Sequence, residues 1–209
     1  MELSHIFVFA LPSDVRILAG FGLVESFRRV HAGQGTNNVC FCFDNAYLEL
    51  LFVDDEAVLG GLIDTGLLER SWWRKSRASP FGIAVRSFDG LPFATWDYRP
   101  AYLPKEMVIS VDQGSDDVQQ PFIFSAPGDR RPDQWTNELA GGRQSTNGRL
   151  EITSIDLYQP QPSAAALRGL ERAGIVRVHP GTSSHKMVLG MTRSDGSIDA
   201  LTLPHFHLD

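Results

Sequence analysis

The chain has 209 residues, 43% of them apolar, and a formal net charge of −6 at pH 7. This length allows one sizeable core, or two or three small units that share one. The negative charge argues against nucleic acid as the main partner, because binding a polyanion requires clustered Lys and Arg and a positive field.

The sequence favours a cytoplasmic protein with no membrane partner. The start, "MELSHIFVFALP", lacks the basic segment of a signal peptide, and no stretch approaches the roughly 18 to 20 apolar residues of a membrane helix. The only two cysteines, Cys40 and Cys42, lie two apart on one predicted strand, where side chains of the same face are poorly placed for a disulfide. Free thiols and the absence of an export signal indicate the cytoplasm.

The first 55 residues predict a strand, a short helix and three more strands. In the first strand, residues 3–10, His5 alternates onto one face with Leu3, Phe7 and Phe9. "PSDVRILAG" predicts the helix, which the glycines after it would end. "VESFRRVHAG", "TNNVCFCF" and "AYLELLFV" predict the other strands, with an Asp-Asn turn joining the last two.

The rest of the chain predicts the same pattern of elements twice more, the first time without the helix. Residues 56–126 predict a connector, which carries the basic and aromatic "ERSWWRKSRASP", followed by a second unit with strands but no convincing helix. Residues 127–147 are rich in Gly, Pro, Asn and Asp and predict a linker. Residues 148–209 again predict a strand, a helix and three strands, and their "RVHPG" matches the earlier "RVHAG". A degenerate internal repeat explains both observations.

The early residues carry a family resemblance. A first strand with a central His, a short helix, then "HAGQGTNN" and "YLELLFVDD" resemble the glyoxalase-like domains of the vicinal oxygen chelate (glyoxalase/bleomycin resistance/dioxygenase) superfamily. The resemblance is good over residues 3–55 and extends in layout to about residue 126. It implies an α+β fold of βαβββ modules with curled mixed or antiparallel sheets. We therefore expect modules 1–55 and 56–126 to form a cup, and 148–209 to pack as a third, degenerate module.

The resemblance also implies a divalent metal ion in the cup. His5 and Glu49 stand at the two positions that it marks for metal ligands in the first module. An imidazole and a carboxylate both suit Zn, Ni, Fe or Mn, and such an ion would polarise a substrate carbonyl oxygen as a Lewis acid.

The other modules do not supply the remaining ligands, although a metal centre needs about three or four. The matching positions of the second module fall near Phe81 or Gly82 and at Phe124 and Ser125. Those of the third module fall at Ser154 and Ala200, and Asp199 or Asp156 could serve only after a register shift, which would turn a side chain to the other face.

Glu49 is the predicted catalytic residue, and the preferred proton carrier if no metal is bound. Period-two alternation places it with Tyr47 and Leu51 on one face, which we expect to be the cup face. A buried carboxylate requires a cation, a hydrogen-bond donor or water, because burial alone penalises its charge. The alternatives are a carboxylate on a wetted sheet face and, for His5, a hydrogen-bonded core histidine.

We predict that the substrate contacts are His31, Asn38, Tyr47, Trp96 and Tyr98, with Tyr102 as a further stacking wall. His31 precedes a glycine-rich turn, so a loop residue without a ligand is the alternative.

Two functions from different classes follow from these residues and from the resemblance. The leading one is a metal-dependent lyase or isomerase that acts on a small carbonyl compound. The alternative is a binding protein that holds a small drug or metabolite in the same cup without chemistry. In both cases the partner is a small molecule, and we expect a homodimer.

Overall fold

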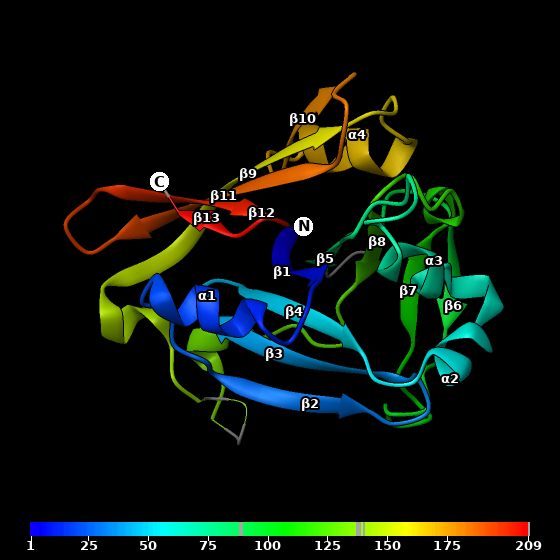
Figure 1. The fold of residues 1–209 in the computed structure, drawn as a ribbon, viewed down its shortest axis with the longest axis horizontal. Helices are drawn as coiled ribbons and strands as arrows, with labels where there is room; N and C mark the ends of the chain where they lie inside the picture. Colours follow the sequence, from blue (N-terminus) through cyan, green and yellow to red (C-terminus); the bar gives the residue numbers. More distant parts are fainter. Residues whose placement is uncertain (88–89, 137–138, 140, 209) are drawn as a thin grey trace.

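The computed structural model describes residues 1–87, 90–136, 139 and 141–208. Its strands form an eight-stranded sheet, in the order β2-β3-β4-β1-β5-β8-β7-β6, and a five-stranded sheet, in the order β10-β9-β11-β12-β13 (Figure 1). The large sheet contains β1 (Glu2–Phe9), β2 (Phe27–His31), β3 (Thr36–Cys42), β4 (Tyr47–Val53), β5 (Phe81–Arg86), β6 (Thr95–Tyr98), β7 (Ile109–Asp112) and β8 (Phe122–Ser125). The small sheet contains β9 (Arg149–Gln159), β10 (Arg177–Pro180), β11 (Lys186–Arg193), β12 (Ile198–Leu203) and β13 (His207–Leu208).

The helices are short. The α-helices are α1 (Asp14–Gly20), α2 (Glu56–Gly60), α3 (Leu67–Ser71) and α4 (Ala165–Arg172), and 3-10 turns occur at η1 (Ile63–Thr65), η2 (Gln113–Asp116), η3 (Pro132–Gln134) and η5 (Gln144–Asn147). In the described part of the chain, no helix is long and apolar enough to cross a membrane.

The large sheet consists of two halves with the same arrangement. In the first half β1 pairs with β4 in parallel, and in the second half β5 pairs with β8 in parallel. The halves join where β1 and β5 run antiparallel, so each half presents a similar curved face to one side. These mixed sheets with few helices confirm the predicted α+β class.

One core holds the outer face of the large sheet against the small sheet. Alternate residues of the strands enter it, such as Ile6 of β1 and Leu48 of β4, which are fully buried. The first half has its own helix, α1, whose Leu18 enters the same core. Each fully buried aliphatic side chain of this kind contributes about 1.5–3 kcal/mol.

Helix α4, which belongs to the third module, covers the outer face of the second half of the large sheet. The second half has no helix between β5 and β6 among the described residues. Leu167 and Leu170 of α4 are instead buried in the same core as Ile83 of β5 and Ile123 of β8. The third module thus supplies the apolar cover that the second module lacks.

The third module has the expected order of elements, but its strands pair differently from those of the first. β10, the strand after the helix, lies next to β9 in parallel. In the first module the corresponding strand, β2, lies at the far edge, beyond β3 and β4.

A β-bulge at the start of β1 changes the side of the sheet to which its first residues point. The register against β5 shifts between Leu3 and His5, which inserts Ser4 as an extra residue. Leu3 consequently packs against the outer core, whereas Ser4 and His5 both face the cup. The prediction that Leu3 shares a face with His5 is therefore wrong.

The connector between the two halves is fastened by one buried arginine. Arg70 of α3 has no exposed surface, and its guanidinium donates to the carbonyl oxygens of Val118 at 3.0 Å and Ser115 at 2.7 Å. Because these carbonyls lie between β7 and β8, Arg70 ties α3 to the second half of the sheet.

The packing of Gly82 on Phe7 is testable. A Cβ at Gly82 would lie 2.0–2.4 Å from three carbons of the Phe7 ring, so Gly82→Ala should cost about 1–3 kcal/mol of unfolding free energy by overpacking. Gly20→Ala is the control, because a Cβ there meets nothing within 4 Å, and it should stay within about 0.5 kcal/mol of the wild type. Urea denaturation measures both, and a Gly82→Ala variant as stable as the wild type would contradict this packing.

Candidate functional site

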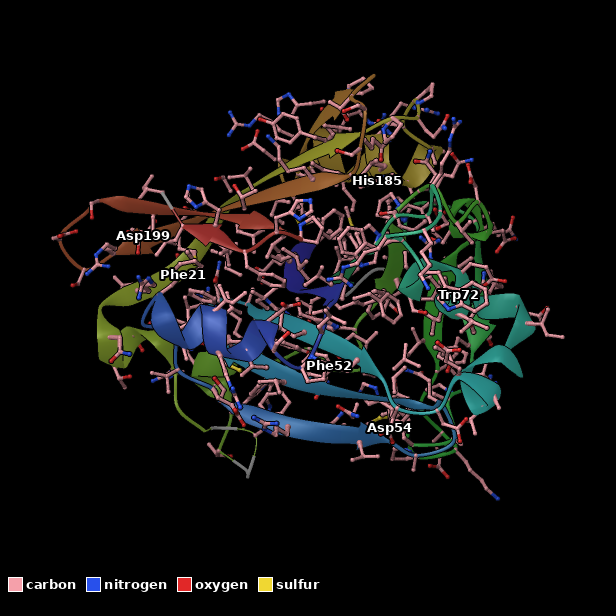
Figure 2. All side chains as sticks on the ribbon, in the orientation of Figure 1. Phe21, Phe52, Asp54, Trp72, His185 and Asp199 are labelled. Carbon is pink, nitrogen blue, oxygen red and sulfur yellow. The ribbon has the colours of Figure 1, made fainter. Side chains whose placement is uncertain are left out.

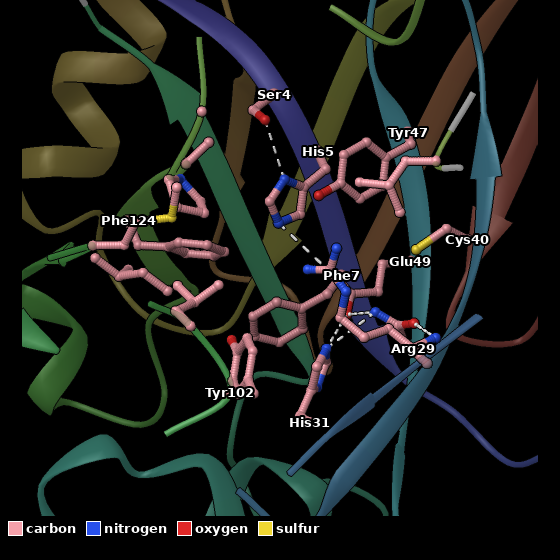
Figure 3. A pocket seen from close by; sticks show the side chains of 18 of the residues that line it. Ser4, His5, Phe7, Arg29, His31, Cys40, Tyr47, Glu49, Tyr102 and Phe124 are labelled. Carbon is pink, nitrogen blue, oxygen red and sulfur yellow. Dashed lines mark hydrogen bonds and ion pairs between the residues drawn. The ribbon is translucent and has the colours of Figure 1, made fainter. Parts of the chain in front are cut away.

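The cup face of the large sheet encloses a cavity of about 780 Å³ (Figure 3). Both halves of the sheet line it, with His5 from β1, Glu49 from β4 and Phe124 from β8. No described residue after 139 lines it, so the third module takes no part in its wall. A cavity of this size suits a small organic molecule.

Seven of the predicted site residues meet in this cavity. They are His5, His31, Asn38, Tyr47, Glu49, Tyr98 and Tyr102. Trp96 is not among the residues that line it; this residue pairs with Val111 of β7 and packs on the apolar cluster that contains Val111. His31 is the last residue of β2 and is buried, so it is a residue of the cavity wall and not of an open loop.

Glu49 lies at the centre of the wall formed by β4. The alternation of this strand sends Leu48 and Leu50 into the outer core and Glu49 into the cup, where only 7% of its surface is exposed. Asn38 Nδ2 donates a hydrogen bond to Glu49 Oε1 at 2.7 Å. His5 Nε2 lies 3.7 Å from Oε2, and His31 Nε2 lies 4.0 Å from Oε1.

Burial raises the pKa of Glu49 from 4.5 to about 7. The hydrogen bond from Asn38 and the charge of Arg29, an exposed residue at the rim, lower this pKa but do not cancel the effect of burial. The folded chain therefore binds this proton more tightly than the unfolded chain does. Stability falls as the pH rises from about 4.5 to 7, and ionised Glu49 costs on the order of 3 kcal/mol above that range.

A hydrogen-bond chain fixes the Asn38 amide and the tautomer of His31. The backbone N–H of Arg29 donates to Asn38 Oδ1 at 2.9 Å, so Asn38 Nδ2 must face Glu49. The same Nδ2 lies 3.3 Å from His31 Nε2, which must then accept. The proton of His31 is therefore on Nδ1 and donates to Thr36 Oγ1 at 2.8 Å.

The chain of hydrogen bonds continues across the cavity to the second half of the sheet. Gln34 Nε2 donates to Thr36 Oγ1 at 2.7 Å, and Gln34 Oε1 accepts from the Tyr98 hydroxyl at 2.7 Å. Gln34 and Thr36 were not among the predicted site residues. The signal for Thr36 was present, because it alternates with Asn38 on the same strand.

His5 and His31 are both neutral at physiological pH. Burial is the largest cause that lowers the pKa of His5 to about 3, followed by the charge of Arg86. Burial, followed by the charge of Arg29, lowers that of His31 to about 4. His5 is also stacked on Tyr47, with ring centroids 4.3 Å apart, and its Nδ1 lies 3.2 Å from Ser4 Oγ.

The second half of the cup is apolar where the metal ligands were sought. Phe81 points into the outer core, and Gly82 has no room for a side chain because the Phe7 ring fills the space. Phe124 of β8 presents its ring to His5 edge-on at 5.3 Å. The polar groups that surround Glu49 therefore come from the first half of the sheet.

As they lie, these residues do not fit a resident metal ion. Two neutral imidazoles and one carboxylate are suitable donors. However, the Asn38 amide N–H, which cannot ligate, bonds Glu49 Oε1 and faces His31 Nε2 in the space that an ion between them would need. Within the described residues, no group of three or more His, Cys, Asp or Glu is placed to hold a metal.

Comparisons with known proteins yield fold relatives only. No family model matches the chain, and no curated protein matches it. A hypothetical protein from Staphylococcus aureus has a similar solved structure, with a TM-score of 0.52 at 14% identity over 88% of this chain and 87% of that one. This likeness concerns the fold.

Two enzymes of the vicinal oxygen chelate superfamily match less well. Methylmalonyl-CoA epimerase from Streptomyces coelicolor matches with a TM-score of 0.37 at 15% identity, over 60% of this chain and 95% of that chain. A mutant of 4-hydroxymandelate synthase from the same organism matches with a TM-score of 0.40 at 12% identity, over 96% and 61%. These scores are too low to carry an argument about this chain.

Metal content tests the metal pair that the sequence predicts at His5 and Glu49. Because Asn38 holds Oε1 of Glu49 and no group of three or more His, Cys, Asp or Glu among the described residues is placed to hold a metal, we expect protein purified without chelator to retain far less than one equivalent of Zn, Ni, Fe or Mn. Elemental analysis of the wild type and of His5→Ala should give the same low values. One equivalent of metal in the wild type that is lost in His5→Ala would contradict this expectation.

Proposed function

We propose that this protein is an enzyme that moves a proton on a small, enolisable carbonyl compound, as an isomerase or lyase of the glyoxalase-like kind. The observation that carries the proposal is Glu49, a carboxylate in a largely apolar cup whose pKa is raised to about 7. A general base works best when its pKa is near the pH at which the enzyme operates.

Glu49 is oriented for proton abstraction through one of its two oxygens. Oε1 accepts the hydrogen bond from Asn38, which leaves Oε2 with no donor within hydrogen-bond distance among the described residues. In its ionised form, Oε2 would take a proton from the carbon next to the substrate carbonyl. The apolar wall limits water around the carboxylate and so keeps it a strong base.

The Tyr102 hydroxyl is the candidate donor for the oxygen that gains charge in this step. Its ring is stacked on His31 with centroids 4.5 Å apart, and the hydroxyl has no hydrogen-bond partner among the described residues. Tyr102 lines the same cavity as Glu49 and lies beside His31 and Phe7 in Figure 3. A donor held in place before the reaction stabilises a developing enolate more than water does.

The resemblance of residues 3–55 to glyoxalase-like domains supports this choice of reaction class. The resemblance marks the positions of His5 and Glu49 for metal ligands on the concave face, and here both side chains line the same cavity. The proposal needs no metal ion, because it assigns the proton transfer to Glu49 alone.

A second function, binding without chemistry, is favoured by the apolar second half of the cup. Phe122 and Phe124 of β8 line the cavity and offer no acid or base opposite Glu49. Together with the Tyr47 and Tyr102 rings, they would suit a flat, aromatic drug or metabolite.

Deuterium exchange tests the proposed proton transfer. A panel of 2-oxo acids, hydroxyketones and acyl thioesters is incubated with the protein in D2O, and proton NMR follows the loss of the signal next to the carbonyl. At least one compound should exchange, with a rate that rises with pH through about 7 as Glu49 ionises. Glu49→Gln should slow this exchange by about 10²- to 10⁴-fold, because an amide cannot accept the proton.

Glu106→Gln is the matched control for this experiment. It makes the same chemical change at an exposed position that does not line the cavity, and its exchange rate should equal that of the wild type. Exchange by Glu49→Gln at the wild-type rate would refute the role of Glu49. Tight binding of an aromatic ligand without exchange of any compound would favour the binding protein.

A further inference from the structure

The register of β2 against β3 places Arg29 on the cup face of the large sheet. Arg29 pairs with Asn38 and lies two positions before His31, the last residue of the same strand. His31 and Asn38 line the cavity, and alternation puts Arg29 on their side, where it lines the cavity too. The opposite face of the sheet is filled by apolar side chains such as Phe52 of β4, labelled in Figure 2. Arg29 is therefore part of the cup wall.

The Arg29 guanidinium is accessible and unpaired. The residue is exposed, and its side chain makes no hydrogen bond or ion pair within the described part of the chain. Its positive charge nevertheless acts on the cup, because it lowers the pKa values of His31 and Glu49. Five N–H donors thus stand at the mouth of the cavity, near Glu49 and without an acceptor.

The lining of the cup carries a surplus positive charge at its rim. Four charged side chains occur among the described residues that line the cavity, namely Arg29, Arg130, Asp129 and Glu49. Glu49 keeps its proton up to a pH of about 7, because burial raises its pKa. The two arginines then exceed the one ionised carboxylate by a single charge, which attracts a small anion to the mouth.

The distance between Arg29 and Glu49 suits the two ends of one small molecule. Only β3 separates β2 from β4, so the backbones of these two residues lie about 10 Å apart. Both side chains reach into the same cavity and shorten that span. An anionic group held by Arg29 would therefore lie within a few bonds of a carbon placed at Glu49.

We propose that the substrate of the cup is a small oxo acid whose carboxylate pairs with Arg29 at the rim while the carbon beside its carbonyl lies at Glu49. The proposal rests on the function proposed above for the same cavity. The planar guanidinium can donate two parallel hydrogen bonds to a carboxylate. A single surplus positive charge suits this group better than a doubly charged phosphate.

Calorimetric titration at pH 6 tests the assignment with 2-oxopentanoate and 2-oxo-4-phenylbutanoate, each compared with its neutral methyl ester. At this pH Glu49 still keeps most of its proton, so it does not repel the acids. We expect the acids to bind at least about tenfold tighter than their esters. Arg29→Gln should weaken acid binding by about tenfold or more and change ester binding by less than about twofold.

Arg28→Gln is the matched control. It makes the same chemical change at the next residue of β2, which does not line the cavity and whose guanidinium donates to the Glu25 carboxylate. Both acid and ester binding should stay within about twofold of the wild type.

Three results would overturn the proposal. They are acids that bind no tighter than their esters, equal losses in Arg29→Gln and Arg28→Gln, and an Arg29→Gln variant that loses acid and ester binding alike, which would indicate a structural role.

Deuterium exchange of the same compounds separates this proposal from the proposed function. Exchange of neutral carbonyl compounds that depends on Glu49, without any preference for the acids in binding, would retain the proton transfer and refute the carboxylate site. Acid binding that depends on Arg29, without exchange of any compound, would support the carboxylate site and refute the proton transfer.

Discussion

The hydrogen bond from Asn38 to Glu49 is the interaction on which the cup depends. Burial of a carboxylate among aromatic side chains is costly, and within the described residues this bond is the only direct hydrogen bond that offsets the cost. It exists because β2, β3 and β4 are aligned so that Arg29 faces Asn38 and Cys40 faces Glu49. A slip of one residue in either pairing would turn these polar groups away from the cavity.

The outer core is what allows the sheet to carry such a costly arrangement. Every second residue of β1 and β4 is buried against the small sheet, α1 or α4, so the strands are fixed from behind. The cup face can then present groups chosen for their chemistry instead of their packing. The third module contributes to this support through α4 without contributing to the wall of the cup.

Much of this arrangement could be read from the sequence, because it rests on local alternation. The period of two over residues 47–53 placed Tyr47 and Glu49 on the same face, and the structure has them there. The same rule failed at Leu3, since a bulge at the next residue depends on how β1 pairs with β5. The alternation rule also could not show that Trp96 lies outside the cavity lining. Trp96 and Tyr98 are two residues apart on β6, so the rule places both on the same face.

Other features depend on contacts between distant segments. The position of β10 beside β9, and the cover that α4 gives to β5 and β8, follow from tertiary packing that no local pattern encodes. The role of Asn38 is of the same kind. The sequence indicated a substrate contact there, and the structure adds that the amide bonds Glu49 and lies between this carboxylate and His31. Only the register of three strands brings these side chains together.

The central claim is that the carboxyl group of Glu49 carries its proton up to about neutral pH. A ¹³C NMR titration of protein labelled at the glutamate carboxyl carbons tests it directly, with the Glu49 signal assigned by its loss in Glu49→Gln. We expect this signal to titrate with a midpoint near 7, because burial outweighs the hydrogen bond from Asn38. A midpoint at or below the ordinary value of about 4.5 would contradict the account, since it would mean that the carboxylate is solvated or paired with a cation.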